Sequence, residues 1–253
     1  MSAADLPRRG RPSFARLVEV EARKQVDTRS GRWLLGTAAA LVLAVYGAGA
    51  LLGGAGGFAD AFAVGAMPLG VLLPVITILG VTTEWSTGSS VITFGLEPRR
   101  GRVLAAKVLG GLGIAAALIV LALVAAALTT WLAAVPRGRT PAWDLSWWQV
   151  TGLSLLLLLG SAQGAALGAL IQHTAASVAG FLLVPTLGTV LFTAVLDNGP
   201  LVAWLSINDA MAPLTGPVPV TTTQLAQLGT AGALWIVVPG VLGAFRWARR
   251  EIS

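Results

Sequence analysis

The sequence has no cysteine, a single histidine, His173, and few charged side chains. Without cysteine there are no disulfides and no thiolate metal ligands, and one histidine without carboxylate clusters leaves little from which to build a metal site. Only 11% of the residues are charged, against roughly 25% in soluble domains, whereas 55% are apolar and the mean hydropathy is +0.79. A soluble domain of this composition would expose large apolar patches to water, so the composition predicts a membrane protein.

Motifs of several enzyme classes are also absent. The chain has no Walker phosphate-binding loop, no HExxH zinc motif and no acidic pair within an apolar stretch. Ser89 and Ser90 follow Gly88 and resemble a serine nucleophile only superficially, which leaves an intramembrane protease that uses His173 as a remote alternative. We therefore expect no catalytic site, no metal and no cofactor bound by this chain.

Six apolar stretches are long enough to cross about 30 Å of hydrocarbon as helices. None contains Asp, Glu, Lys or Arg, each of which would cost about 2.5–3.5 kcal/mol at the centre of a membrane helix. The predicted spans are residues 33–52, 62–83, 108–132, 150–171, 175–196 and 228–245. The sequence thus predicts an all-α integral membrane protein with six transmembrane helices.

The distribution of Lys and Arg predicts the orientation of these spans. Fifteen of the 17 cations precede the first span, lie between the second and third, or follow the sixth, and only Arg137 and Arg139 lie on the other side. Because cytoplasmic loops carry the excess of Lys and Arg, both termini should be cytoplasmic. The same rule explains the net charge of +6, so we expect no nucleic-acid partner. Trp33, Trp85 and Trp247 should mark the inner membrane interface.

The segment before the first span divides into two parts. Residues 1–13 are rich in Arg and Pro and are predicted to be disordered. In residues 14–32, an apolar stripe with helical spacing predicts an amphipathic helix in the inner interface, with its cations facing anionic lipid. A solvated lead-in without a defined position is the alternative. The stripe consists of Phe14, Leu17, Val18, Ala22 and Val26.

The loop between the fifth and sixth spans, residues 197–227, is longer than a simple connection needs. Its apolar part, residues 201–211, predicts a short helix that dips into the outer leaflet, with a plain surface loop as an equal alternative. Glycines spaced by four are typical of close helix contacts, either within one subunit or at a dimer seam. The two such series are Gly49, Gly53 and Gly57, and Gly160, Gly164 and Gly168.

Residues 84–107 form a polar, basic connection between the second and third spans. This connection is longer than a turn needs, and its stretch from Ser89 to Phe94 lacks proline. Val91 and Phe94 lie one helical turn apart, and Pro98 would end a helix here. Glu84 and Lys107 flank the connection and are placed to pair. We expect a short cytoplasmic helix that a soluble partner can contact.

Three stretches resemble the membrane subunits of ABC transporters, in the type 2, exporter-class permease family. The first is residues 18–33, VEVEARKQVDTRSGRW, and the third is the apolar, then basic tail at residues 245–251. The second and most specific runs from EWSTG at residues 84–88 through PRRGR at residues 98–102 to Ala106 and Lys107. The layout of six spans with a long last outer loop is also similar. Family members often have an Arg after the fourth span, where this chain has Gln172 and His173.

The resemblance implies a six-helix permease domain over residues 33–253 in a bacterial plasma membrane. This domain would pair with a second copy or a homologous permease and with two cytoplasmic ATPase subunits that hold ATP and Mg. It also implies a coupling helix between the second and third spans. The implied coupling residues are Glu84, Thr87, Gly88, Val91, Phe94, Pro98, Arg99, Arg100, Arg102 and Lys107. In the interfacial helix the resemblance points to Glu21, Lys24 and Arg29. For the arginines alone, a role as ordinary positive-inside anchors is an equal alternative.

The spans carry a few polar residues that are candidates to line a pathway: Thr77, Ser154, Ser161, Gln163, Thr186, Thr189 and Thr193. An otherwise apolar lining favours a lipid-like or amphipathic, drug-like substrate and export. A proton-coupled carrier is disfavoured because no span contains a carboxylate. Two alternatives remain: a sodium-coupled or facilitative carrier that needs no ATPase, and a membrane anchor or sensor that transports nothing.

Overall fold

The computed structural model describes residues 13–52, 57–87, 99–144, 146–197 and 199–249, with only the backbone for residues 84–87. These residues contain no strand, and six of their helices are long and apolar enough to cross a membrane. The six predicted spans are therefore confirmed, with ends that shift by several residues. The candidate spans are Arg29–Leu52, Phe58–Thr83, Arg100–Arg137, Trp147–Ile171, Thr174–Val195 and Thr222–Arg249.

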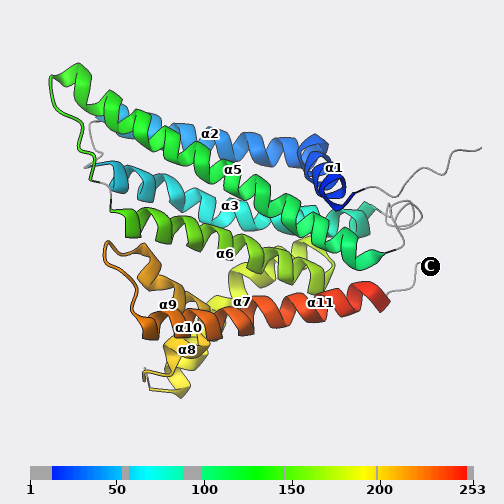
Figure 1. Ribbon diagram of the computed structural model, residues 1–253. Helices are drawn as coiled ribbons and strands as arrows, with labels where there is room; N and C mark the ends of the chain where they lie inside the picture. The colour runs from blue at the N-terminus through cyan, green and yellow to red at the C-terminus, as the bar shows by residue number, and fades with distance from the viewer. Residues whose placement is uncertain (1–12, 53–56, 88–98, 145, 198, 250–253) are drawn as a thin grey trace, which may run out of the picture.

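Helices α3 (Phe58–Thr87) and α6 (Trp147–Ile171) form the centre of the bundle. In each of these two spans, half of the residues in the most apolar stretch are buried, a larger share than in any of the other four candidate spans. Figure 1 shows the two helices running side by side, with α2 and α5 on the side of α3 and α11 on the side of α6. These other long helices are α2 (Arg29–Leu52), α5 (Arg100–Ala134), α7 (Thr174–Val195) and α11 (Val238–Arg249).

Glycines allow α3 and α6 to approach each other closely. A Cβ added to Gly164 would lie 2.8 Å from the carbonyl oxygen of Pro74, and Gly160 and Gly168 face the same helix. This series is therefore a contact face within one chain. In the other predicted series, a Cβ on Gly49 would lie 3.5 Å from the Thr129 side chain of α5, and a Cβ on Gly57 would meet the carboxylate of Asp144. Its middle glycine lies outside the described residues.

Side chains cap the helix ends as their sequence positions allow. Ser146 Oγ accepts a hydrogen bond from Gln149 N at the start of α6, and Thr221 and Gln224 form a capping box at the start of α10. His173 Nδ1 accepts from Ala176 N and caps α7. The preceding Gln172 has a φ of 57°, in the left-handed region that ends α6.

The predicted interfacial helix at residues 14–32 ends earlier than expected. Helix α1 (Phe14–Asp27) stops at Thr28, and α2 begins at the next residue. A Cβ on Gly31 would lie 1.8 Å from the carbonyl oxygen of Gln25, so only glycine fits this tight turn. The turn lets α1 lie across the bundle at the level where α2 and α5 start (Figure 1).

At the opposite end of the bundle, the short helix η1 (Val135–Arg137) follows α5. The guanidinium of Arg137 donates to the carbonyl oxygens of Leu51 and Ala133, at 2.9 Å each. A cation is favourable at these helix C-termini because their carbonyls carry partial negative charge. Arg137 thus joins the ends of α2 and α5.

The predicted outer loop forms a small packed unit that we call the helical cap. The apolar stretch predicted as one short helix forms two, and the last span begins at Thr222 rather than at residue 228. Leu214 reaches α6, where a Cβ on Gly152 would lie 2.2 Å from its carbonyl oxygen. The cap consists of α8 (Val202–Leu205), α9 (Ile207–Met211), η2 (Ala212–Thr215) and α10 (Thr222–Gly232).

Trp247, predicted to mark the inner membrane interface, is buried within the bundle and not exposed on its surface. Its side chain is 1% exposed and packs in a cluster with Val81 of α3, Val103 of α5 and Ala169 of α6. Gly243 on the same helix lets α11 approach the backbone of α6. Burial of a large indole here holds α11 to the bundle, whereas Trp33 is exposed as expected.

Candidate functional site

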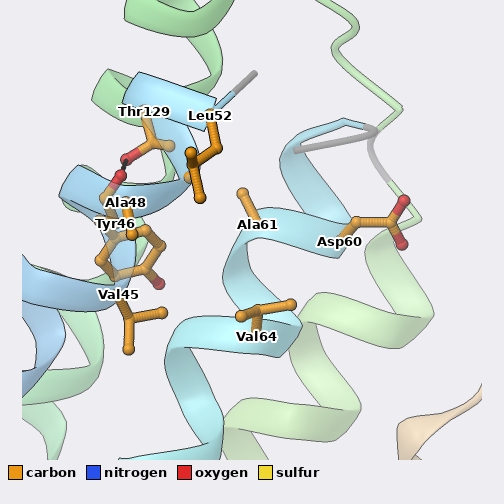
Figure 2. Close-up of a pocket in the computed structure, with 9 residues that line it drawn as sticks. Val45, Tyr46, Ala48, Leu52, Asp60, Ala61, Val64 and Thr129 are labelled. Carbon is orange, nitrogen blue, oxygen red and sulfur yellow. Dashed lines mark hydrogen bonds between the residues drawn. The ribbon is translucent and has the colours of Figure 1, made fainter. Parts of the chain in front are cut away.

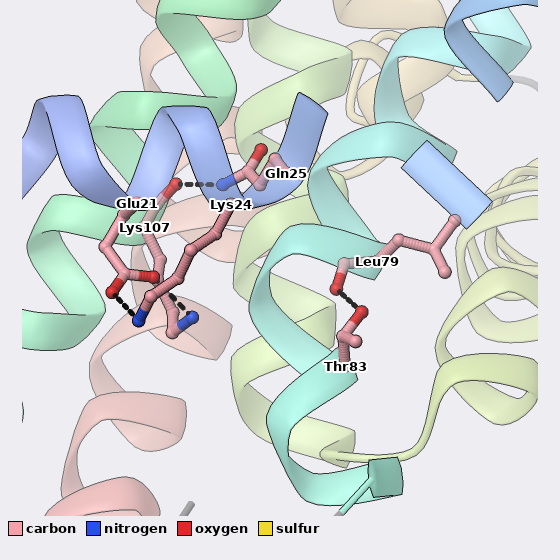
Figure 3. A network of polar contacts seen from close by, with 6 residues as sticks. All are labelled: Glu21, Lys24, Gln25, Leu79, Thr83 and Lys107. Atoms are coloured by element: carbon pink, nitrogen blue, oxygen red, sulfur yellow. Dashed lines mark hydrogen bonds and ion pairs between the residues drawn. The ribbon is translucent and has the colours of Figure 1, made fainter. Parts of the chain in front are cut away.

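A buried ion pair joins α1 to the start of α5. Lys107 Nζ lies 2.7 Å from Glu21 Oε2, and the two residues are 3% and 1% exposed. The other carboxylate oxygen of Glu21 lies 2.7 Å from the ammonium of Lys24. Figure 3 shows the carboxylate between these two ammonium groups. Every formal charge of the buried pair is therefore compensated by a close partner.

Polar residues, and not the apolar stripe, form the most buried face of α1. Glu21 and Gln25 lie one turn apart and are buried, whereas Phe14 and Val26 of the predicted stripe are 38% and 40% exposed. The Nε2 atom of Gln25 donates to the carbonyl oxygen of Lys107 at 3.1 Å. Partners on α5 thus make burial of this polar face favourable, and contact of the apolar stripe with the membrane interface stays a prediction.

Glycines on α3 and α5 make room for α1. A Cβ added to Gly110 would lie 3.1 Å from the backbone nitrogen of Ala22. At Gly80 it would lie 2.4 Å from the side-chain amide carbon of Gln25, and Gly111 faces the same amide. We call α1, with the adjoining ends of α3, α5 and α11, the helical base.

The electrostatic environment keeps Glu21 charged. Burial by itself raises the pKa of this carboxyl, but the ammonium groups of Lys107 and Lys24 outweigh that effect and lower the pKa below its ordinary value of 4.5. The network therefore holds α1 in place at neutral pH. Breaking a buried pair of this kind typically costs about 3–5 kcal/mol, because one charge is left buried and uncompensated.

The arginines at the start of α5 extend this network toward α1. Arg99 immediately precedes α5, and Arg100 and Arg102 lie in its first turn. The guanidinium carbon of Arg102 lies 6.0 Å from the centre of the Phe14 ring, a cation–π distance. Arg29, the third residue predicted for the interfacial helix, is the first residue of α2 and is exposed.

The rest of the predicted coupling segment lies outside the described residues. This applies to the side chains of Glu84 and Thr87 and to Gly88, Val91, Phe94 and Pro98. The coupling helix and the pairing of Glu84 with Lys107 stay predictions. The described contact of Lys107 with Glu21 is one that the sequence reasoning missed, although both residues had been singled out.

The structure does not bring the seven predicted pathway residues together. Thr77 Oγ1 lies 2.8 Å from the carbonyl oxygen of Pro74 and 2.9 Å from that of Ser161, at the buried contact of α3 with α6. Gln163 is also buried, and Ser154 donates to the carbonyl of Val150 in its own helix.

The three pathway candidates of α7 lie in a different environment. Thr189 Oγ1 lies 2.7 Å from Ser206 Oγ and accepts from Asn208 Nδ2, so it binds the helical cap. Thr186 is exposed on the surface of α7, and Thr193 is half-buried.

A hollow of about 360 Å³ opens where α2 ends and α3 begins. Small and aliphatic side chains such as Val45, Ala48 and Val64 line it, and none of the predicted pathway residues does. Figure 2 shows the carboxylate of Asp60 pointing away from the other side chains of the hollow. The hollow therefore offers an apolar surface without a directed charge.

No metal centre accompanies these features in the part of the chain that the structure describes, where no three His, Asp or Glu side chains gather. The fold and the site together define a multi-pass helical membrane protein with an ion-paired helical base. The chain matches no protein-family model and no curated protein.

Proposed function

We propose that this chain is the transmembrane permease subunit of an ATP-driven ABC exporter. It forms the translocation path as a dimer, with a second copy or a homologous permease, and two separate ATPase subunits bind ATP and Mg. The observation that supports this most is the buried pair of Glu21 and Lys107, since Lys107 ends the connection at residues 84–107. A force applied to that connection by a partner would be transmitted to α1, α3 and α5 together.

Orientation and location are part of the same proposal. The end that carries α1, the start of α5 and the end of α11 holds most of the cations, which favours a cytoplasmic position in a bacterial plasma membrane. Soluble ATPase subunits would then meet the helical base. Anionic lipid would neutralise exposed cations such as Arg29 of α2.

The distribution of charged residues in the spans favours an energy source outside this chain. No described carboxylate lies at the buried centre of a span, so a proton gradient has no group to act on there. ATP-driven closure of the partner would tilt α3, whose central position would pass the movement to α6 and α7. The apolar surfaces of the spans suit a lipid-like or amphipathic, drug-like substrate.

The proposal is tested by co-purification from the native host. We expect an ATPase subunit to purify with the wild-type chain and to be lost when Val91→Asp and Phe94→Asp are combined, since two carboxylates would oppose burial in a partner groove. Val218→Asp, at an exposed position between η2 and α10, is the matched control and should retain the ATPase. Unchanged co-purification after the double substitution would contradict the proposal.

A second experiment distinguishes an exporter from a carrier that needs no ATPase. The purified chain alone, in proteoliposomes with or without a sodium gradient, should not move a fluorescent amphipathic probe, and transport should require the ATPase and ATP. Transport by the lone chain would favour a sodium-coupled or facilitative carrier. Binding of the ATPase without any transport would favour an anchor or sensor.

A further inference from the structure

The last span is not one continuous α-helix. Between α10 and α11, residues Ala233–Val237 form the π-helical segment η3, in which the N–H of Val238 donates to the carbonyl of Ala233, five residues back. Pro239 follows directly and has no N–H to donate, so one further carbonyl loses its main-chain donor. Helices bend most readily at such bulges and prolines.

Glycines weaken the same stretch without serving close contact. A Cβ added to Gly229 or Gly232 would meet nothing within 4 Å. Glycine in a helix interior increases the entropy lost on folding, and at these two positions no neighbouring helix requires it. The segment therefore combines a π bulge, a proline and two unneeded glycines within three turns.

The two halves of the last span are attached to different parts of the molecule. Ala231 of α10 is fully buried in a cluster with Ile207 and Met211 of the helical cap. In α11, Gly243 approaches the backbone of α6, and Trp247 is buried in the helical base. The π segment lies between these two attachments.

Helix α7 contains a proline near the π segment. Pro185 lies inside α7, where it removes one main-chain hydrogen bond. One turn further on, Gly188 faces the ring of Trp235 from the π segment, at 2.9 Å from an added Cβ. Trp235 Nε1 also donates to the carbonyl of Leu205 in the cap, at 2.6 Å. The π segment therefore contacts α7 one turn beyond Pro185 and is joined to the cap through the same side chain, that of Trp235.

We infer that the helical cap and the outer half of α7 move as one body relative to the helical base, with the contact between Leu214 of the cap and Gly152 of α6 opening as they move. The hinge consists of Pro185 in α7 and the π segment η3 in the last span, with Trp235 as their shared contact. The hydrogen bonds of Thr189 to Ser206 and Asn208 keep the outer half of α7 attached to the cap. This hinge deepens the proposed function, because its opening would give an exported substrate its exit, but it requires no ATPase to be observed.

The test uses spin labels on the cysteine-free chain in lipid nanodiscs, with distances measured by double electron–electron resonance. Labels at the exposed positions Leu225 of the cap and Val120 of α5 span the hinge, and labels at Leu242 and Val120 do not. We expect a broad or two-peaked distance distribution for the first pair and a single narrow peak for the second. Equally narrow distributions for both pairs would overturn the inference.

A stiffened variant tests which residues form the hinge. Pro185→Ala, Gly229→Ala and Gly232→Ala together should reduce the first distribution to one narrow peak, because alanine favours the continuous helix. The matched control is Gly113→Ala in α5, where an added Cβ also meets nothing within 4 Å, and it should leave the distribution unchanged. A distribution that stays broad in the stiffened variant would contradict the assignment of the hinge.

Transport measurements separate this inference from the proposed function. If the exporter proposal holds, the stiffened variant should retain the ATPase on purification and lose most of its transport, about tenfold or more. If no ATPase joins even the wild-type chain, the exporter proposal fails, while the distance distributions still decide the hinge.

Discussion

Glu21 is the residue on which the position of α1 depends. Its carboxylate is buried between the ammonium groups of Lys107 and Lys24, and the three residues come from two helices far apart in the sequence. An exposed pair on the same helix, Glu19 with Arg23, has a similar separation of 2.6 Å but lies in solvent. The two pairs allow burial to be tested as the cause of stability.

We expect Glu21→Gln to lower the free energy of unfolding by about 3 kcal/mol at neutral pH, because Lys107 would keep a buried charge without its counterion. Because the pKa of Glu21 is lowered in the folded protein, its stabilisation is complete above the unfolded-chain value of 4.5. It is lost as the pH falls through the lowered pKa. Chemical unfolding in detergent at about pH 7 and about pH 3 should show the difference from wild type shrinking with acid.

The control for this prediction is Glu19→Gln, which removes the same charge from the exposed pair. It should change the free energy of unfolding by less than about 1 kcal/mol at either pH. A loss at Glu19 as large as the loss at Glu21 would show that net charge, and not the buried pair, matters.

The individual residues show where sequence reasoning reached its limit. Glu21 and Lys107 were both singled out, but their pairing depends on the approach of two helices and could not be read from either stretch. Trp247 was placed at the interface because aromatic residues beside arginines are common there. It is buried because Gly243 lets α11 approach α6.

At the scale of elements, α1 docks where α5 has glycine. A Cβ built on Gly110 would lie 3.4 Å from the Cβ of Ala22, just below the separation found in disulfides. Gly113, one turn further along α5, faces open space. The docked position of α1 can therefore be fixed covalently.

We expect Ala22→Cys with Gly110→Cys to form a disulfide on mild oxidation, detected as a shift on a non-reducing gel. Because the natural chain has no cysteine, no background reaction competes. Ala22→Cys with Gly113→Cys should stay reduced. Equal cross-linking of both pairs, or of neither, would mean that α1 does not occupy the described position.

The elements were largely predictable because membrane spans are long, apolar and free of central charge. The start of the last span was missed, although Thr221 and Gln224 have the spacing of a capping box. The cap itself was predicted only in part, since its two short helices are stabilised by contacts with α6, α7 and α10 that no local pattern encodes. The π segment has no sequence signature beyond the proline that follows it.

For the whole molecule, the described helices place α1 and the end of α11 at one end of the bundle and the start of α10 at the other (Figure 1). The excess of cations at the first end is the basis for the proposal that this end faces the cytoplasm. The seven pathway candidates, in contrast, do not converge within one chain, because polar composition alone does not distinguish a lining residue from a buried helix contact such as Thr77.

We expect a membrane-impermeant maleimide to label Val218→Cys in intact cells and to leave Ala15→Cys unlabelled until the cells are permeabilised. Both positions are exposed, so accessibility within the protein does not differ between them. The reverse pattern would invert the orientation and remove the site proposed for the ATPase.

The order of synthesis gives the pair of Glu21 and Lys107 a consequence for biogenesis. The two residues are separated by 86 positions, so at roughly 5–20 residues per second the ribosome makes the lysine on the order of ten seconds after the glutamate. During that interval the amino-terminal helix has no counterion from the third span. Maturation of this end of the polypeptide must therefore await later insertion events, and a chain truncated before the third span would keep its first helix unanchored.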